Sequence, residues 1–321
     1  MARSESGTRS SNVFSRFVPG VGRRAVILLL CLGIVGLLSD GCSGDAQSQP
    51  TDKSTGSPAT TYVSDVKTAK YGTDPNQYGD LRLPKGAGPF PVVVLIHGGY
   101  WRAGFGLDLM DGLADDLTRR GYATWNIEYR RVGQKGGGYP GTLSDVAAAI
   151  DYLTELARSH PLDAKRVAIV GHSAGGHLAA WAAGRGRLPA GAPGADPAVK
   201  PLVTVSLAGV LDLLAAYAQN SGNGATAELM RASPEDAPER YMNASPMSLL
   251  PTGSSLLIVH GTLDANVPRT QSETYYAAAT AAGDRAELLI IDGADHFDVI
   301  NPASYAWGRV AERLEALMPA R

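Results

Sequence analysis

Short apolar runs alternate with amphipathic stretches along most of this chain. Residues 91–96, P-V-V-V-L-I, are wholly apolar and largely β-branched, which is typical of a strand buried on both faces of a parallel sheet. Residues 107–120 have helical spacing and end at Gly121, a plausible helix stop. The same patterns predict further strands at 62–69, 80–83, 122–129, 166–170, 202–207, 256–260 and 287–291, and helices at 142–158, 174–183, 270–282 and 305–317.

Strands and helices therefore alternate at the spacing of βαβ units. This alternation predicts an α/β fold with a mostly parallel central sheet and helices on both faces. Residues 210–251 interrupt it with mixed apolar and polar positions and several prolines. Connections between sheet and helix are usually 2–6 residues long, so we expect a small helical cap here, over the carboxyl edge of the sheet.

The first 60 residues have a different character. Five arginines and one glutamate precede an unbroken run of apolar residues and glycine at 25–38. As a helix, this run would be only about 21 Å long, short of the ~30 Å hydrocarbon core of a bilayer. The pattern favours an export signal over residues 1–41, and a short membrane anchor is the alternative. Residues 42–60 are polar and predict a flexible tether, which leaves residues 61–321 for the folded domain.

The two cysteines bear on location and chemistry. Cys31 lies in the apolar run, and Cys42 follows it in L-S-D-G-C. That segment is similar in part to a bacterial lipoprotein signal, which implies lipidation of Cys42 and a membrane tether. An incidental cysteine beside an ordinary cleavage site is the alternative. We expect an exported protein, secreted or held at the cell surface. Residues 61–321 contain no cysteine, so a disulfide, a thiolate metal site and a catalytic thiol are excluded there.

Gly171 to Gly175 spell G-H-S-A-G, which follows one predicted strand directly and opens directly into a helix. That setting is typical of a nucleophile elbow, a sharp turn that exposes its serine above the sheet. A side chain at either glycine would collide across the turn. We therefore predict Ser173 as a nucleophile. A serine at an ordinary helix N-cap is the alternative.

A serine hydroxyl needs a base, and histidine suits that task near neutral pH. His296 lies in a polar loop after the last predicted strand, late enough for the order Ser–Asp–His of α/β-hydrolases. Asp264, in the loop after the preceding strand, is the predicted acid, 91 residues after Ser173 and 32 before His296. Asp212, before the cap, is its rival. Asp264 could also be a simple turn residue.

The segment H-G-G-Y-W at residues 97–101 follows the buried strand at 91–96. Glycines let the backbone approach a substrate, and N–H groups aimed at a developing oxyanion stabilise the transition state of acyl transfer. The candidate donors are the N–H groups of Gly98 or Gly99 and of Ala174, with a plain glycine turn as the alternative. Tyr100 and Trp101 either form a pocket wall or pack beneath the loop.

These motifs together resemble the esterase and arylformamidase branch of the α/β-hydrolases. The resemblance rests on H-G-G-Y-W, the Y-R of residues 129–130, G-H-S-A-G-G-H, A-S-P at 244–246, H-G-T-L-D-A-N-V-P and the His296 loop, and it covers nearly all of residues 63–317. Kynurenine formamidase-like proteins and feruloyl or acetyl esterases share the H-G-G-x-W and Y-R pattern. The resemblance implies catalytic roles for Ser173, Asp264 and His296, and oxyanion roles for Gly98, Gly99 and Ala174.

We therefore expect a serine hydrolase that cleaves small or aromatic carboxylic esters through an acyl-enzyme, with no metal or cofactor. The export signal favours esters over a formamide of tryptophan breakdown. An amidase or peptidase with the same residues, and an inactive surface-binding protein on this scaffold, are the alternatives. The net charge is −2 and no basic block is present, so a nucleic-acid partner has no electrostatic support.

Overall fold

The computed structural model describes residues 65–320. The expected export signal, the tether and Cys42 lie outside the described residues. Within residues 65–320, no helix is both long enough and apolar enough to cross a membrane.

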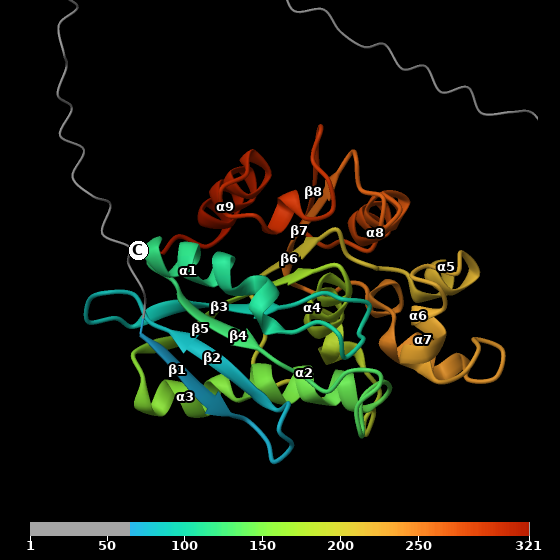
Figure 1. The fold of residues 1–321 in the computed structure, drawn as a ribbon, viewed down its shortest axis with the longest axis horizontal. Helices are drawn as coiled ribbons and strands as arrows, with labels where there is room; N and C mark the ends of the chain where they lie inside the picture. The colour runs from blue at the N-terminus through green and yellow to red at the C-terminus, as the bar shows by residue number, and fades with distance from the viewer. Residues whose placement is uncertain (1–64, 321) are drawn as a thin grey trace, which may run out of the picture. The chain divides into compact units, whose positions relative to one another are not determined.

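An eight-stranded sheet forms the centre of the described chain, in the order β1-β2-β4-β3-β5-β6-β7-β8 (Figure 1). The two pairs that involve β2 are antiparallel and all others are parallel, which confirms the predicted mostly parallel sheet. The strands are β1 (Val66–Lys70), β2 (Tyr78–Arg82), β3 (Phe90–Ile96), β4 (Ala123–Ile127), β5 (Leu162–His172), β6 (Val203–Leu207), β7 (Ser255–Gly261) and β8 (Ala286–Ile291).

Helices cover both faces of this sheet (Figure 1). Alternate residues of β3 enter different hydrophobic cores, because successive side chains of a strand point to opposite faces. Val92 and Val94 join the core with the helices at 141–151 and 174–184, whereas Val93 and Leu95 join the core with the helices at 111–119 and 305–317. The helices are α1 (Asp111–Arg119), α2 (Gly141–Asp151), α3 (Leu153–Ser159), α4 (Ala174–Gly184), α5 (Leu213–Ala218), α6 (Ala225–Met230), α7 (Pro238–Ala244), α8 (Thr270–Ala281) and α9 (Tyr305–Leu317).

The helix expected at 107–120 begins with a 3₁₀ turn at Leu107–Met110, and two further elements differ from the pattern-based expectation. The helix expected at 142–158 is divided at Tyr152 into α2 and α3, where the Thr154 hydroxyl donates to the Asp151 carbonyl. β5 begins at Leu162, four residues early, because a register shift beside Val92 lets its first residues pair with the start of β3. Neither difference moves a predicted site residue.

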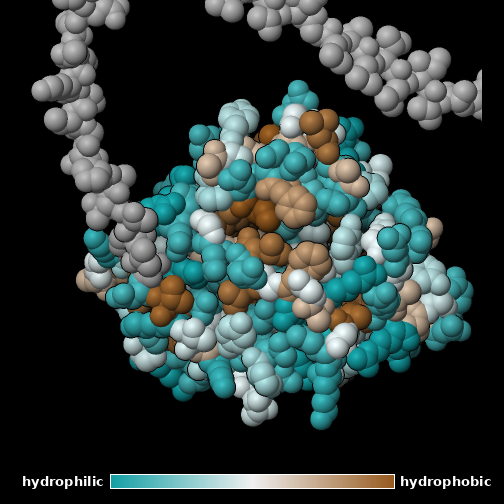
Figure 2. All heavy atoms as spheres, in the orientation of Figure 1, coloured by the Kyte–Doolittle hydropathy of each residue, from teal (hydrophilic) through white to brown (hydrophobic). Residues whose placement is uncertain are grey.

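Residues 210–251 contain the three short helices α5, α6 and α7, which lie together beyond one end of the sheet, at the right of Figure 1. Their buried side chains, among them Leu213, Leu229 and Tyr241, belong to the same core as α4. The visible surface of the described chain is mostly hydrophilic, and its hydrophobic residues form several patches (Figure 2).

Candidate active site

Ser173 lies on a sharp turn between the end of β5 and the start of α4. Its backbone has φ 56° and ψ −117°, a conformation that costs free energy for a residue with a side chain. The flanking glycines make the turn possible. A Cβ on Gly171 would lie 2.0 Å from the carbonyl oxygen of Gly175, and a Cβ on Gly175 would lie 2.0 Å from that of Ile96. The turn therefore has the geometry of a nucleophile elbow.

His296 and Asp264 form a buried pair, 32 residues apart in sequence. The imidazole Nδ1 lies 2.7 Å from Asp264 Oδ2, and both side chains are almost wholly buried. The other carboxylate oxygen, Oδ1, accepts hydrogen bonds from the backbone N–H groups of Asn266 and Val267. Because the aspartate occupies Nδ1, the ring keeps Nε2 for a proton received from elsewhere.

His260 is a third member of this cluster that the sequence analysis did not identify. Its Nε2 lies 3.3 Å from Asp264 Oδ2 and 3.0 Å from the Val267 carbonyl oxygen. Since both neighbours are acceptors, Nε2 carries the proton. Burial alone would raise the pKa of Asp264, but hydrogen bonds from His260, His296 and the Val267 backbone outweigh it and hold that pKa well below its usual range. The carboxylate is therefore ionised throughout the neutral range.

The His296 ring lies against His172, the residue that precedes the elbow serine. The two ring centroids are 4.5 Å apart, and His172 Nε2 donates to the carbonyl oxygen of His296 at 2.9 Å. Burial, followed by the charge of His296, lowers the pKa of His172 to about 3, so this ring is neutral. The contact brings the His296 loop to the elbow. No hydrogen bond joins the Ser173 hydroxyl to His296 in this conformation of residues 65–320, and such bonds often tighten only when substrate binds.

The glycines of H-G-G-Y-W lie directly beside the elbow. A Cβ on Gly98 would come within 3.0 Å of Ser173 Cβ and 2.9 Å of the His172 carbonyl oxygen. Gly99 has φ 108°, a conformation that strongly favours glycine. In the described chain, no carbonyl or side chain accepts a hydrogen bond from the N–H groups of Gly98, Gly99 or Ala174. Unpaired N–H groups from two loops thus flank the serine, as an oxyanion site requires.

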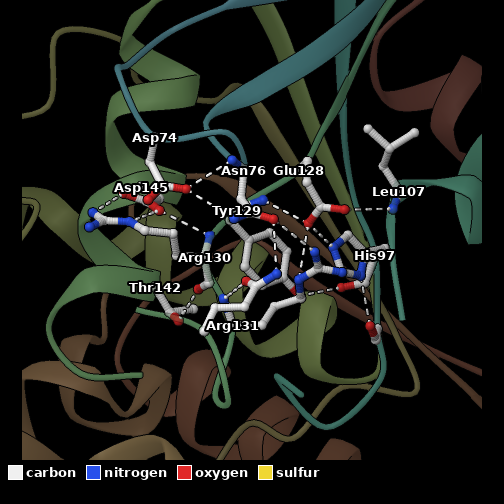
Figure 3. Close-up of polar contacts among 12 residues, drawn as sticks. Asp74, Asn76, His97, Leu107, Glu128, Tyr129, Arg130, Arg131, Thr142 and Asp145 are labelled. Carbon is white, nitrogen blue, oxygen red and sulfur yellow. Dashed lines mark hydrogen bonds and ion pairs between the residues drawn. The ribbon is translucent and has the colours of Figure 1, made fainter. Parts of the chain in front are cut away.

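A second carboxylate fixes this glycine loop from behind (Figure 3). Glu128 Oε1 lies 3.0 Å from His97 Nε2, and His97 Nδ1 lies 2.8 Å from the Gly98 carbonyl oxygen. Glu128 also accepts from the backbone of Leu107 and Tyr129, and the Arg131 guanidinium lies 3.4 Å away. Burial would raise the pKa of Glu128, but the bond from His97 outweighs it and the pKa is lowered. The sequence analysis assigned no role to Glu128 or His97.

Tyr129 and Arg130, the Y-R pair of the sequence pattern, extend this support. The Tyr129 ring stacks on His97 with centroids 4.4 Å apart, and its hydroxyl donates to the His97 carbonyl at 2.9 Å. The Arg130 backbone and guanidinium both donate to Asp145, which is buried on α2 (Figure 3). The Y-R pair therefore attaches the glycine loop to the helix behind it.

Trp101 links three parts of the site, whereas Tyr100 lies against the cap. Trp101 Nε1 donates to His177 Nδ1 on α4, and His177 Nε2 donates to the Ala244 carbonyl at the end of α7. Burial lowers the pKa of His177 to about 4, so the ring is neutral in this bridge. A Cβ on Gly222 would meet the Tyr100 ring at 2.4 Å. Trp101 packs beneath its loop, and both aromatic residues also line a pocket.

Two other aspartates, the rival Asp212 and Asp295 beside His296, have capping roles. Asp212, the rival acid, accepts from the backbone N–H groups of Leu214 and Ala215 and serves as the N-cap of α5. Asp295 caps the turn after it through Phe297 and Asp298. Across residues 65–320, no group of three or more histidine, cysteine, aspartate or glutamate side chains is arranged to hold a metal ion.

The chain is similar in sequence to proteins that are named as esterases. A probable isoprenylcysteine alpha-carbonyl methylesterase from Oryza sativa subsp. japonica is 27% identical over 258 residues, which cover 73% of this chain and 58% of the relative. Esterase LipQ from Mycobacterium tuberculosis is 30% identical over 199 residues, 60% of this chain and 46% of the relative. The chain thus spans about half the length of these relatives.

The fold also matches solved structures. A truncated carbohydrate esterase from gut microbiota superposes with a TM-score of 0.68 at 21% identity, over 78% of this chain and 96% of the other. This likeness confirms the predicted α/β-hydrolase fold. The model of the BD-FAE family matches residues 80–278, which is more than half of the chain. With the elbow, the His–Asp pair and the glycine loop in place, the chain belongs to the BD-FAE family, within the esterase and arylformamidase branch that its motifs predicted.

Proposed function

We propose that this protein hydrolyses small-molecule carboxylic esters through an acyl-enzyme on Ser173. The observation that carries the proposal is the strained Ser173 turn, packed against both the His296 loop and the glycine loop. Backbone strain at a non-glycine residue persists where the surroundings enforce it, and it clusters at active sites. The names of the relatives, a methylesterase and an esterase, support the same chemistry.

In the first half-reaction, Ser173 Oγ attacks the ester carbonyl and its proton passes to His296 Nε2. The carbonyl oxygen becomes an oxyanion that accepts hydrogen bonds from Gly98 or Gly99 and from Ala174. Asp264 stabilises the imidazolium through Nδ1. The tetrahedral intermediate then collapses to an acyl-enzyme, and the alcohol leaves with the proton from His296.

In the second half-reaction, His296 removes a proton from water, which attacks the acyl carbonyl. Collapse of the second tetrahedral intermediate releases the carboxylic acid and returns the proton to Ser173. All steps use side chains and backbone groups of this chain, and atoms balance as ester plus water to acid plus alcohol. We further propose that the reaction occurs outside the cytoplasm, on the pattern of residues 1–42.

The test compares wild type with Ser173→Ala on p-nitrophenyl acetate, an N-formyl aryl amine and a dipeptide amide. We expect ester hydrolysis by wild type and a fall in kcat of about 10⁴ or more in the variant. A fluorophosphonate probe should label wild type and leave the variant unlabelled. A folded wild type that is neither labelled nor active would reject the proposal, and faster turnover of the amides would reassign the substrate class.

A further inference from the structure

His260 and Ser272 form a buried polar pair next to the acid Asp264. Both side chains are 0% exposed, and His260 Nδ1 lies 2.8 Å from the Ser272 hydroxyl oxygen. The reaction proposed above gives neither residue a role. A polar group buried in this way costs free energy unless it is hydrogen-bonded, so the partners of each ring atom show what the pair does.

The packing of α8 on β7 brings the two side chains together. Ile258 and His260 lie two residues apart on β7, so they point to the same face of the sheet. Ser272, Tyr275 and Ala279 have the spacing of one face of α8. Since Ile258, Tyr275 and Ala279 share a hydrophobic core, this face of the helix packs on this face of the strand. Ser272 meets His260 at the carboxyl end of β7, beside the acid loop.

The neighbours of the His260 ring decide which of its nitrogens carries the proton. Nε2 faces two acceptors, the Val267 carbonyl oxygen at 3.0 Å and Asp264 Oδ2 at 3.3 Å, so the proton is on Nε2. Nδ1 of the neutral ring then has a lone pair and requires a donor. A serine hydroxyl can donate or accept, and here only donation matches the ring. Ser272 therefore stabilises the tautomer that presents an N–H group to the acid loop.

That N–H group supports the acid loop in two places. It binds the Val267 carbonyl oxygen, and the Val267 N–H donates to Asp264 Oδ1 at 2.9 Å. It also lies against Oδ2, the oxygen that holds His296 Nδ1. In the other tautomer, a lone pair would face both oxygens and repel them. Burial raises the pKa of Asp264, and the bond from His260 is the largest of the interactions that lower this pKa.

We propose that His260 and Ser272 are positioning residues for the acid. Ser272 sets the tautomer of His260, His260 fixes the acid loop, and Asp264 then orients His296 and stabilises its charged form. The acid and its support both come from one continuous segment, residues 260–272. This inference rests on the proposed ester hydrolysis at Ser173, because it concerns the rate of that reaction.

The first test measures the tautomer directly and needs no substrate. Wild type labelled with ¹⁵N-histidine is examined by NMR near neutral pH, and the spectrum of His260→Phe identifies the His260 signals by their loss. We expect a proton on Nε2 of His260 and none on Nδ1. A proton on Nδ1 would overturn the inference, whatever the activity of the protein.

The second test compares Ser272→Ala with Ser254→Ala as its matched control. Ser254 directly precedes β7 at the opposite end of the strand, and its buried hydroxyl lies 2.9 Å from that of Thr204. Each variant thus removes one buried hydroxyl from a polar pair, and urea unfolding should show a loss of stability in both. We expect kcat on p-nitrophenyl acetate to fall about fivefold in Ser272→Ala at unchanged KM, the equivalent of one net hydrogen bond, and to stay at the wild-type value in Ser254→Ala.

Ser272→Cys keeps a weaker donor, so it should recover part of kcat. A folded Ser272→Ala with the kcat of wild type would overturn the inference, and so would an equal fall in both alanine variants, which would trace the loss to stability alone. If Ser272→Ala does not fold, the wild-type tautomer still decides. A wild type without esterase activity would instead reject the proposed function, on which the tautomer measurement does not depend.

Discussion

Two carboxylates beside the active site each hold a histidine, and the two pairs differ in what they leave free. Asp264 binds His296 through Nδ1 alone, so Nε2 remains for proton transfer. Glu128 binds His97 through Nε2, and the Gly98 carbonyl occupies Nδ1. The first pair leaves one ring nitrogen available for proton transfer. In the second pair, both ring nitrogens contact fixed neighbours. In the proposed reaction, the same pair of side-chain types serves catalysis in one place, and in the other it positions the glycine loop.

The surroundings account for this difference. Asp264 and His296 lie on loops at the carboxyl ends of parallel strands, the edge where ligands bind in open α/β sheets. Glu128 and His97 directly follow β4 and β3 at the same edge of the sheet, but there Tyr129 stacks over the His97 ring and both ring nitrogens face fixed acceptors. We therefore expect changes at Asp264 to affect chiefly the rate, and changes at Glu128 to affect chiefly the stability.

The largest effect should follow Asp264→Asn. The amide cannot stabilise the imidazolium and can hold the wrong tautomer, so kcat should fall about 10³-fold to 10⁴-fold. Steady-state kinetics on p-nitrophenyl acetate provide the measurement. His260→Phe, which removes one donor to the same carboxylate, serves as the graded control, with a loss of about tenfold. Near-full activity in Asp264→Asn would contradict the assignment of the acid.

Glu128→Gln should reduce the stability more than the rate. The amide places a donor among the donors of His97, Tyr129 and Leu107 and leaves the Arg131 charge without its partner. Breaking such a buried pair destabilises a protein by about 3 kcal/mol. Urea unfolding measures that loss, and kinetics should show only about a tenfold fall in kcat with little change in KM. If Glu128→Gln abolished activity at unchanged stability, the contrast between the two pairs would fail.

The smallest effect concerns a third histidine, His177, which must stay neutral between Trp101 and Ala244. Its pKa is lowered to about 4 by burial, from about 6.5 in an unfolded chain. The stabilising contribution is therefore complete above about pH 6.5 and declines as the pH falls toward 4, by about 1.4 kcal/mol per unit.

Urea unfolding of wild type and His177→Gln at pH 7, 6 and 5 tests this expectation. The free energy of unfolding of wild type should fall more steeply with acid than that of the variant. His172, with its pKa lowered to about 3, contributes in the same direction to both proteins. Parallel curves would show that His177 does not titrate as the structure implies.

The hydrophobic pattern predicted the strands β3 to β8, in their order along the chain, and it predicted the fold class. It missed the interruption at Tyr152 and the early start of β5, because both depend on local hydrogen bonds and on pairing with β3. For the site, the spacing of serine, aspartate and histidine placed the three predicted residues in neighbouring loops. It left Asp212 as a rival, which the contact of Asp264 with His296 and the helix-capping contacts of Asp212 remove from the site.

Sequence alone determined the features that act over a few residues: the glycines that a sharp turn requires, the apolar strands on both sides of it, and the kinds of side chain that acyl transfer needs. Tertiary structure decided which polar atoms meet. Glu128 faces His97 across 31 residues, and His177 joins Trp101 to the end of α7. Such contacts depend on how separate elements pack against one another, and a periodic pattern carries no record of that packing.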